Sequence, residues 1–151
     1  MKTNIVLALL GLLSISVAGA DEKLCGVRLV EMAQQTLEKT QTFYDVGMAT
    51  SYEMLMAEKQ VLDLKLCNDP YEFITFTAVS SNILKRLDYA TTLFENGMVI
   101  SANIGVIKSE RQGLYILCAT DLVPAAEARF NSGMVTKQTL AELKKSCEAL
   151  K

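Results

Sequence analysis

The chain has 151 residues and a net charge of −2, half of its residues are hydrophobic, and it contains neither histidine nor tryptophan. Without histidine it lacks the commonest general base and the commonest metal ligand, and it has no block of basic residues that would favour nucleic acid. It also has no glycine-rich phosphate loop and no nucleophile–histidine pair, so the composition argues against an enzyme.

The first twenty residues have the three parts of a secretory signal peptide. Lys2 supplies a positive start, residues 5–17 form an apolar run, and Ala18-Gly19-Ala20 is a small-residue cleavage site. The apolar run is too short to span a hydrocarbon core of about 30 Å, and charged residues follow it directly. We therefore predict a signal peptide over residues 1–20 and export to the periplasm or, as a second choice, to the outside of the cell. The mature chain, 21–151, is predicted to be a single helical domain without a membrane span.

One short pattern occurs three times in the mature chain. Each copy is a Gly-Met pair with an aromatic residue three places before the glycine, which is Tyr44, Phe94 or Phe130. Glycine readily adopts the left-handed conformation that ends a helix, and the methionine after it can fold back on the last turn. Each copy therefore predicts the tip of a helical hairpin. The three marks are Gly47-Met48, Gly97-Met98 and Gly133-Met134.

The first predicted hairpin has helices over residues 25–45 and 51–66. Between them, Thr50 and Glu53 have the spacing of a capping box, in which the two residues satisfy each other's free N–H groups. The first helix carries an apolar stripe at roughly helical spacing. This stripe consists of Val27, Val30, Leu37 and Tyr44.

The middle hairpin is the least regular. Asp69 and Pro70 predict the N-cap and the first position of a helix over residues 70–95. Residues 73–77 and 114–117 are rich in strand formers. They lie inside segments whose length and helix-ending signals match those of the neighbouring segments, so we predict helix there as well.

In the third hairpin, Asp121 and Pro124 predict a new helix start, and that helix runs to Asn131. The last helix is predicted over residues 136–150. The fold class is therefore all-α, a compact bundle of about six helices arranged as three antiparallel hairpins.

Four cysteines in an exported chain favour two disulfides, for which three pairings exist. The hairpin tips provide a ruler for choosing among the pairings. Cys25 lies 22 residues before Gly47 and Cys67 lies 20 residues after it. At 1.5 Å per residue the two arms are about 33 and 30 Å long, so these cysteines meet at the open end of the first hairpin.

The third hairpin has the same geometry. Cys118 lies 15 residues before Gly133 and Cys147 lies 14 after it. A pairing of Cys67 with Cys118 across Gly97 leaves arms of 30 and 21 residues, a mismatch of about 13 Å. We therefore predict that the disulfides close the first and third hairpins; a zinc site is disfavoured because no C-x-x-C spacing occurs.

The first turn and the helix after it, residues 43–62, resemble a motif of the TolC-type outer-membrane efflux proteins. In that family an aromatic residue, a glycine and a small polar residue precede a helix of the form D-x-L-x-A-x-x-x-L. Residues 130–143 match this motif more loosely. The resemblance implies an envelope-associated helical hairpin that contacts other helices, and no functional residue is carried over. Here the helix positions are filled by Glu53, Leu55, Ala57 and Val61 or Leu62.

The side chains that suggest chemistry have simpler explanations. Asp45 and Glu53 lie near the first turn, but a carboxylate pair on a helix surface is far more often solvated than catalytic. Methionine is a soft metal ligand, yet Met54 and Met56 are two residues apart and so lie on different helical faces. We therefore expect no catalytic residue, no metal and no cofactor.

Two kinds of function then remain. The first is an exported protein that docks a helical face on another envelope or secreted protein, as an adaptor, inhibitor or assembly factor. The alternative is a module with an apolar cavity between helices that takes a lipid or another small hydrophobic ligand. A cavity of several hundred Å³ would favour the second, and an exposed apolar stripe would favour the first.

Overall fold

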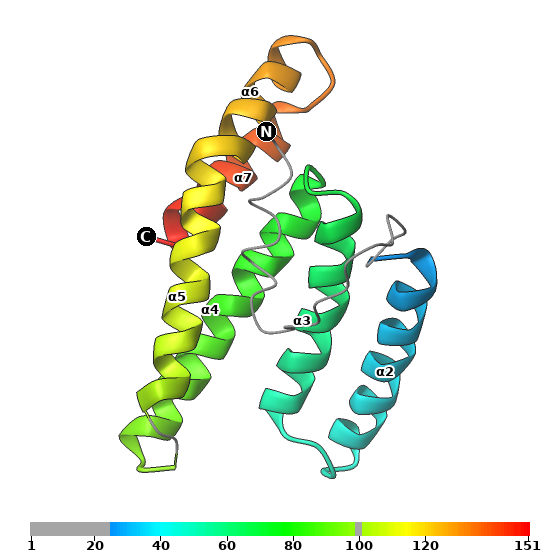
Figure 1. Cartoon of the computed structure of the whole chain (residues 1–151), viewed down its shortest axis with the longest axis vertical. Coiled ribbons are helices and arrows are strands. Elements are labelled where there is room, and N and C mark those ends of the chain that lie inside the picture. Colours follow the sequence, from blue (N-terminus) through cyan, green and yellow to red (C-terminus); the bar gives the residue numbers. More distant parts are fainter. Residues whose placement is uncertain (1–24, 99–100) are drawn as a thin grey trace, which may run out of the picture.

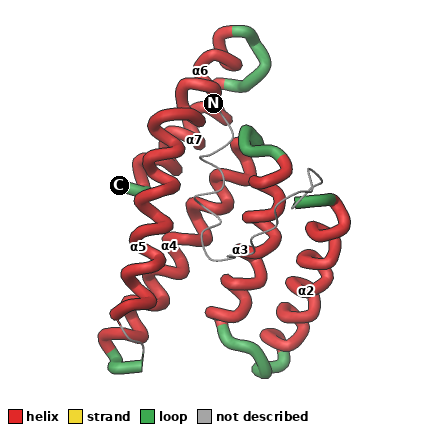
Figure 2. The backbone as a smooth tube through the Cα atoms, viewed as in Figure 1, coloured by secondary structure: helices red, strands yellow, loops and turns green. Residues whose placement is uncertain are grey.

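The computed structural model describes residues 25–98 and 101–151, so the predicted signal peptide lies outside the described residues. Every regular element in these two ranges is helical (Figures 1 and 2). No helix within them is both long enough and apolar enough to cross a membrane. In chain order the elements are α2 (Val27–Asp45), α3 (Ser51–Asn68), α4 (Phe73–Glu95), α5 (Ser101–Leu117), the π-helical segment η1 (Cys118–Leu122), α6 (Val123–Asn131) and α7 (Lys137–Ala149).

The predicted all-α class is confirmed, and the chain reverses direction at each of the three Gly-Met turns. Helices α2, α3, α4 and α5 follow one another in an antiparallel row, and α7 returns along α4 (Figure 1). The main core lies among α4, α5, α6 and α7, and α3 adds Leu62 and Leu66 to it. Helix α2 adds no residue to this core and packs mainly on α3, so it is the outermost helix of the row. The largest fully buried side chains are Phe76, Ile83, Leu114, Leu122, Leu143 and Leu150.

All three Gly-Met turns have the same backbone geometry. Gly47, Gly97 and Gly133 have φ values of 75°, 72° and 75°, in the left-handed region that only glycine adopts freely. At the first turn the Met48 N–H donates to the Phe43 carbonyl at 2.8 Å and the Gly47 N–H donates to the Tyr44 carbonyl at 3.0 Å. The other two turns repeat both bonds, which together define the Schellman helix stop.

The number of helices differs from the prediction. The described ranges hold five continuous helices, because α5, η1 and α6 run on as one rod (Figure 2). Pro124 has no N–H, and its ring would clash with the Thr120 carbonyl in a regular α-helix. The chain absorbs this with a π-helical turn, in which the Val123 N–H donates to the Cys118 carbonyl five residues back. The predicted helix start at Asp121 and Pro124 is therefore wrong.

Helix α4 begins at Phe73, three residues after the predicted Pro70. Asp69 does not cap it: its carboxylate accepts from the Tyr71 N–H at 3.0 Å, which closes a turn before the helix. The two segments rich in strand formers are helical, as predicted. Phe76 and Leu114 lie in them and are almost fully buried, so packing outweighs the local preference for strand.

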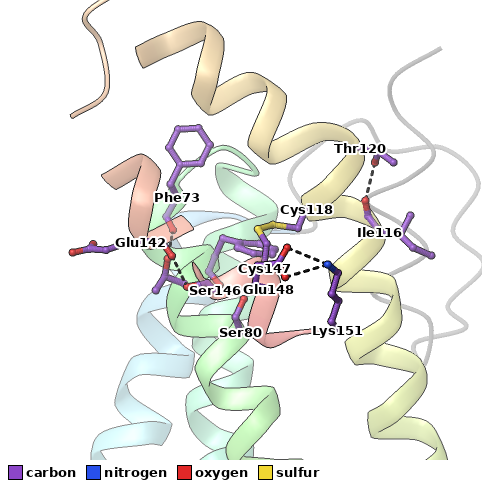
Figure 3. The surroundings of a disulfide bond; sticks show 12 residues. Phe73, Ser80, Ile116, Cys118, Thr120, Glu142, Ser146, Cys147, Glu148 and Lys151 are labelled. Atoms are coloured by element: carbon purple, nitrogen blue, oxygen red, sulfur yellow. Dashed lines mark hydrogen bonds and ion pairs between the residues drawn. A yellow bond between two sulfur atoms is a disulfide. The ribbon is translucent and has the colours of Figure 1, made fainter. Parts of the chain in front are cut away.

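The predicted disulfides are both present. Cys25 is bonded to Cys67 and Cys118 to Cys147, with a Cα–Cα distance of 5.9 Å in each. Figure 3 shows the second bond, which joins the long α5–α6 rod to α7. By loop-closure entropy each bond stabilises the fold by roughly 3.5 to 4 kcal/mol.

Candidate binding groove between α2 and α3

The line along which α2 packs on α3 is uncovered on one side. Of the α2 residues, all of which the structure describes, only Ala33 is buried. Helix α4, by comparison, packs on α3, α5 and α7, and these neighbours bury much of its surface. The apolar side chains at the α2–α3 line are therefore only partly covered by the protein itself.

The end of this line nearer the first turn is hollowed to a volume of about 620 Å³. Its apolar lining comes from Leu37 and Tyr44 of α2 and from Met54 and Leu55 of α3. The polar side chains that complete the lining are Glu38, Gln41, Ser51, Glu58 and Lys85.

The end nearer the Cys25–Cys67 disulfide forms a second hollow of about 780 Å³. Glu38 lines both hollows, so they adjoin along α2. We call the two together the seam groove. The lining of this second half is Val27, Val30, Glu31, Gln34, Gln35, Glu38, Lys65, Asn68, Asp69 and Glu72.

Helical spacing explains why the two hollows form one groove. Along α2 the polar lining residues recur at intervals of three or four, which places them on one face of the helix. Along α3 the lining residues Ser51, Leu55, Glu58 and Lys65 are spaced by four, three and seven residues, which also places them on one face. The apolar stripe that the sequence predicted on the first helix lines this groove. The α2 residues that recur in this way are Glu31, Gln34, Glu38 and Gln41.

The rim of the seam groove is acidic, with five carboxylates against two lysine ammonium groups. On the α2 wall, Glu31 and Glu38 form no ion pair within the described residues. On the opposite wall Glu58 accepts a hydrogen bond from the Asn82 amide at 2.8 Å, which fixes its carboxylate. Lys65 and Lys85 lie on this second wall together with Glu58, Asp69 and Glu72, so its charges are mixed, whereas those of the α2 wall are all acidic.

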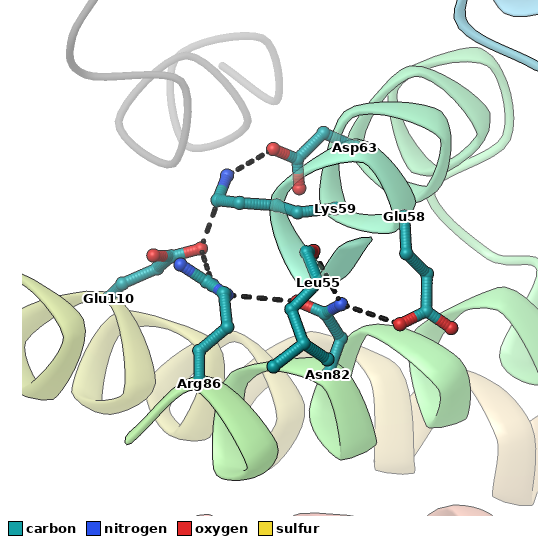
Figure 4. A network of polar contacts seen from close by, with 7 residues as sticks. All are labelled: Leu55, Glu58, Lys59, Asp63, Asn82, Arg86 and Glu110. Carbon is teal, nitrogen blue, oxygen red and sulfur yellow. Dashed lines mark hydrogen bonds and ion pairs between the residues drawn. The ribbon is translucent and has the colours of Figure 1, made fainter. Parts of the chain in front are cut away.

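A polar network holds the α3 wall in place (Figure 4). The Asn82 amide also donates to the Leu55 carbonyl at 2.9 Å, and its oxygen accepts from Arg86 at 2.9 Å. Arg86 continues to Glu110 of α5 at 2.8 Å. Lys59 of α3 completes the network, because its ammonium lies 3.3 Å from the Glu110 carboxylate. Three helices are thereby locked together directly behind the groove.

Asp63 is the outer member of this network and pairs with Lys59. Burial raises the pKa of the Asp63 carboxyl above its ordinary value, and the charge of Lys59 offsets part of that rise. The network therefore contains one carboxylate, that of Asp63, whose charged form is disfavoured by burial.

The predicted turn residues do not gather at one site. Figure 1 places the first and second turns at one end of the molecule and the third at the opposite end. Met48, Met98 and Met134 are 75%, 65% and 73% exposed, so their backbone N–H groups, rather than buried side chains, close the turns. Of the three aromatic residues before the glycines, Tyr44 lines the groove, whereas Phe94 and Phe130 are exposed at other turns.

The carboxylate pair near the first turn has a structural role. Glu53 accepts from the Thr50 N–H at 2.7 Å, and Thr50 in turn accepts from the Glu53 N–H, as the predicted capping box requires. The hydrogen bonds that the Glu53 carboxylate accepts from the Thr50 N–H and the Thr50 hydroxyl lower its pKa. Asp45 accepts from Gln41 instead and makes no pair with Glu53. No group of three or more acidic or cysteine side chains among the described residues could hold a metal ion.

Sequence reasoning missed the residues that shape the groove from α4, namely Asn82, Arg86 and Lys85. A signal was present, because Asn82 and Arg86 lie four residues apart inside the apolar segment of α4 and so share a buried face. Comparisons with protein-family models, with curated proteins and with solved structures found no match to this chain. The seam groove is therefore interpreted from its own geometry.

Proposed function

We propose that this protein is an exported binding protein that holds a segment of another envelope or secreted protein in the seam groove, as an adaptor, inhibitor or assembly factor. The observation that carries the proposal is the groove itself: an apolar floor, an acidic rim and an exposed position on the outermost hairpin. Apolar surface that a fold leaves uncovered between polar rims is typical of protein interaction sites.

The shape of the groove favours a long partner. It follows α2 from Tyr44 to Val27, which is about 25 Å at 1.5 Å per residue. Both hollows are open to solvent and lie end to end, whereas small molecules are usually held in clefts that bury most of their surface. A polypeptide segment can fill the whole length.

The two disulfides support the exported setting, because such bonds persist in oxidising compartments. They also fix the hairpin ends, and the Cys25–Cys67 bond joins the two helices near the end of the seam groove lined by Val27 and Asn68. A preformed groove lowers the ordering cost of binding.

The test is site-specific photocrosslinking of the full-length protein in its own cells. A photoreactive residue replaces Gln41, which lines the groove, and in a matched variant it replaces Gln112, which is exposed on α5. We expect one defined protein adduct from position 41 that is absent from position 112, and the purified partner should bind the mature protein. Equal adducts at both positions, or none at position 41, would overturn the proposal.

A small hydrophobic ligand is the second candidate. The 620 Å³ half of the groove lies within the usual range of small-molecule sites, about 300 to 1,000 Å³, and Leu37 and Met54 contribute an apolar lining. Lipid extraction of the purified protein distinguishes the two candidates. A stoichiometric lipid that is lost from a Met54→Glu variant would favour this second function.

A further inference from the structure

Resting on the proposed function, we infer that the occupant of the seam groove is a basic amphipathic α-helix of about 17 residues, which lies along α2 and α3 as a third helix. The length follows from the groove, since 25 Å corresponds to about 17 residues of helix. The groove runs parallel to two antiparallel helices, and the line between two packed helices is where a third helix of a bundle is seated.

Within the first hairpin α3 packs on both α2 and α4, but α2 packs mainly on α3 alone. The core cluster includes residues of α4, α5, α6 and α7, but from the first hairpin it takes only Leu62 and Leu66, at the α4 side of α3. Leu37, Met54 and Leu55 on the groove side remain half-buried. A helix seated there would complete the burial of these three side chains, as α7 does for α4.

The apolar residues of the groove set the pattern of the occupant. Val30 and Leu37 are seven residues apart on α2, which is two helical turns or about 10.5 Å. Gln34 lies between these two apolar residues, and Glu38 follows Leu37 directly. The occupant is therefore expected to place large apolar side chains at positions i and i+7, as helices in grooves do.

The charges on the α2 wall predict which side chains the occupant carries on the flank that faces α2. Glu31 and Glu38 repeat at the same interval of seven residues along that wall. Lysine or arginine at two positions seven apart in the occupant would lie opposite both carboxylates. The other wall carries Lys65 and Lys85 together with Glu58, Asp69 and Glu72, so its charges are mixed and do not set the charge of the second flank. The acidic rim also disfavours an anionic membrane surface.

The experiment uses a designed 18-residue peptide with leucines at i and i+7 and lysines along one flank. Its binding to the mature, disulfide-bonded protein is measured by calorimetry, and its helicity by circular dichroism. Two control peptides have the same composition in scrambled order or glutamate in place of each lysine. We expect only the basic amphipathic peptide to bind and to become helical on binding. We also expect its affinity to fall as the salt concentration is raised.

Charge reversal on the protein tests the contact itself. The double variant Glu31→Lys, Glu38→Lys alters two exposed side chains that make no ion pair in the described chain, so folding should be retained. We expect it to lose affinity for the basic peptide by about tenfold or more. A single charge reversal away from the groove, Glu95→Lys at the exposed end of α4, should change the affinity less than twofold.

Equal binding of the basic, scrambled and acidic peptides would overturn this inference, as would an unchanged affinity in the double variant. Binding of vesicles with anionic lipids in place of the peptide would also overturn it. These results are separate from the crosslinking at position 41. A specific partner whose crosslinked segment is extended or acidic would agree with the proposed function and would exclude a basic helix as the occupant of the groove.

Discussion

The guanidinium of Arg86 donates to the Glu110 carboxylate at 2.8 Å and thereby ties α4 to α5 at a point where Arg86 is only 3% exposed. The same side chain donates to Asn82, which in turn orients Glu58 at the rim of the seam groove. A charged group inside the fold thus controls the position of a carboxylate on its surface. The seam groove is therefore supported by interactions that lie behind it.

Replacement of Arg86 by methionine should be among the most destabilising single changes. It leaves Glu110 with only Lys59 and removes the donor to Asn82, and loss of one partner of a buried ion pair costs about 3 to 5 kcal/mol. Because Glu110 is partly exposed, we expect the lower end of that range. Urea unfolding with the disulfides intact measures the effect. Arg28→Met on the exposed face of α2 is the control, and an equal loss in both variants would contradict this account.

The pH dependence of stability should show the effect of the raised pKa of Asp63. Burial raises its pKa above 3.8 in the folded protein, so its contribution to stability is present below that value and is lost as the pH rises through the folded pKa. We therefore expect Asp63→Asn to be more stable than the parent protein at pH 7. The difference should shrink as the pH falls toward 3.8.

Glu53 provides the comparison with the opposite sign. Hydrogen bonds from Thr50 lower its pKa below 4.5, so its contribution is present above that value and is lost as the pH falls through the folded pKa. Glu53→Gln should therefore be less stable than the parent at pH 7, and this difference should also shrink in acid. Urea midpoints between pH 3 and pH 7 measure both variants. Differences of the same sign at pH 7 would contradict the assignments.

Much of the fold follows from the sequence because its signals are local. The three Gly-Met turns are set by glycine's backbone freedom, and they place Cys25 and Cys67 at matched distances from Gly47. What failed at Pro124 is the choice between a new helix start and a π-helical turn, which the proline alone does not decide. Pro124 was expected to start a helix, but the rod that contains it is bonded to α7 through Cys118 and is continued by a π-helical turn.

The seam groove was less predictable because it depends on contacts between distant residues. The apolar stripe on the first helix was visible in the sequence, but whether it is covered depends on which helices pack beside it. The sequence pattern does not show that α7 returns to α4 rather than to α2. Asn82 and Arg86 were not singled out either, because their partners lie on α3 and α5, at sequence separations of 24 to 27 residues.

The glycine turns make a prediction in which two similar substitutions have opposite effects. Gly47 has φ 75°, and a Cβ there would meet no atom within 4 Å, so Gly47→Ala is opposed by backbone strain alone, about 1 to 2 kcal/mol. Gly105 lies within α5 and also has open space around it. Gly105→Ala should stabilise the protein by about 0.5 to 1 kcal/mol. Thermal unfolding measures both, and destabilisation by Gly105→Ala would contradict the reasoning.

The two disulfides should differ in what they stabilise. Cys118 and Cys147 belong to the main core, so serine at both positions should lower the free energy of unfolding of the whole protein. The Cys25–Cys67 bond instead fastens α2, a helix that contributes nothing to that core. Serine at these two positions should allow α2 to open by itself, so fast amide hydrogen exchange should appear in α2 while α4 stays protected.

The same pair of variants connects stability to binding. If the seam groove needs α2 held on α3, loss of the Cys25–Cys67 bond should weaken the binding of the basic peptide, because part of the binding energy must then order α2. Loss of the Cys118–Cys147 bond should leave the peptide affinity unchanged under conditions where the protein stays folded. An equal loss of affinity in both variants would show that α2 does not move independently of the core, and the groove would then have to be regarded as part of one cooperative unit.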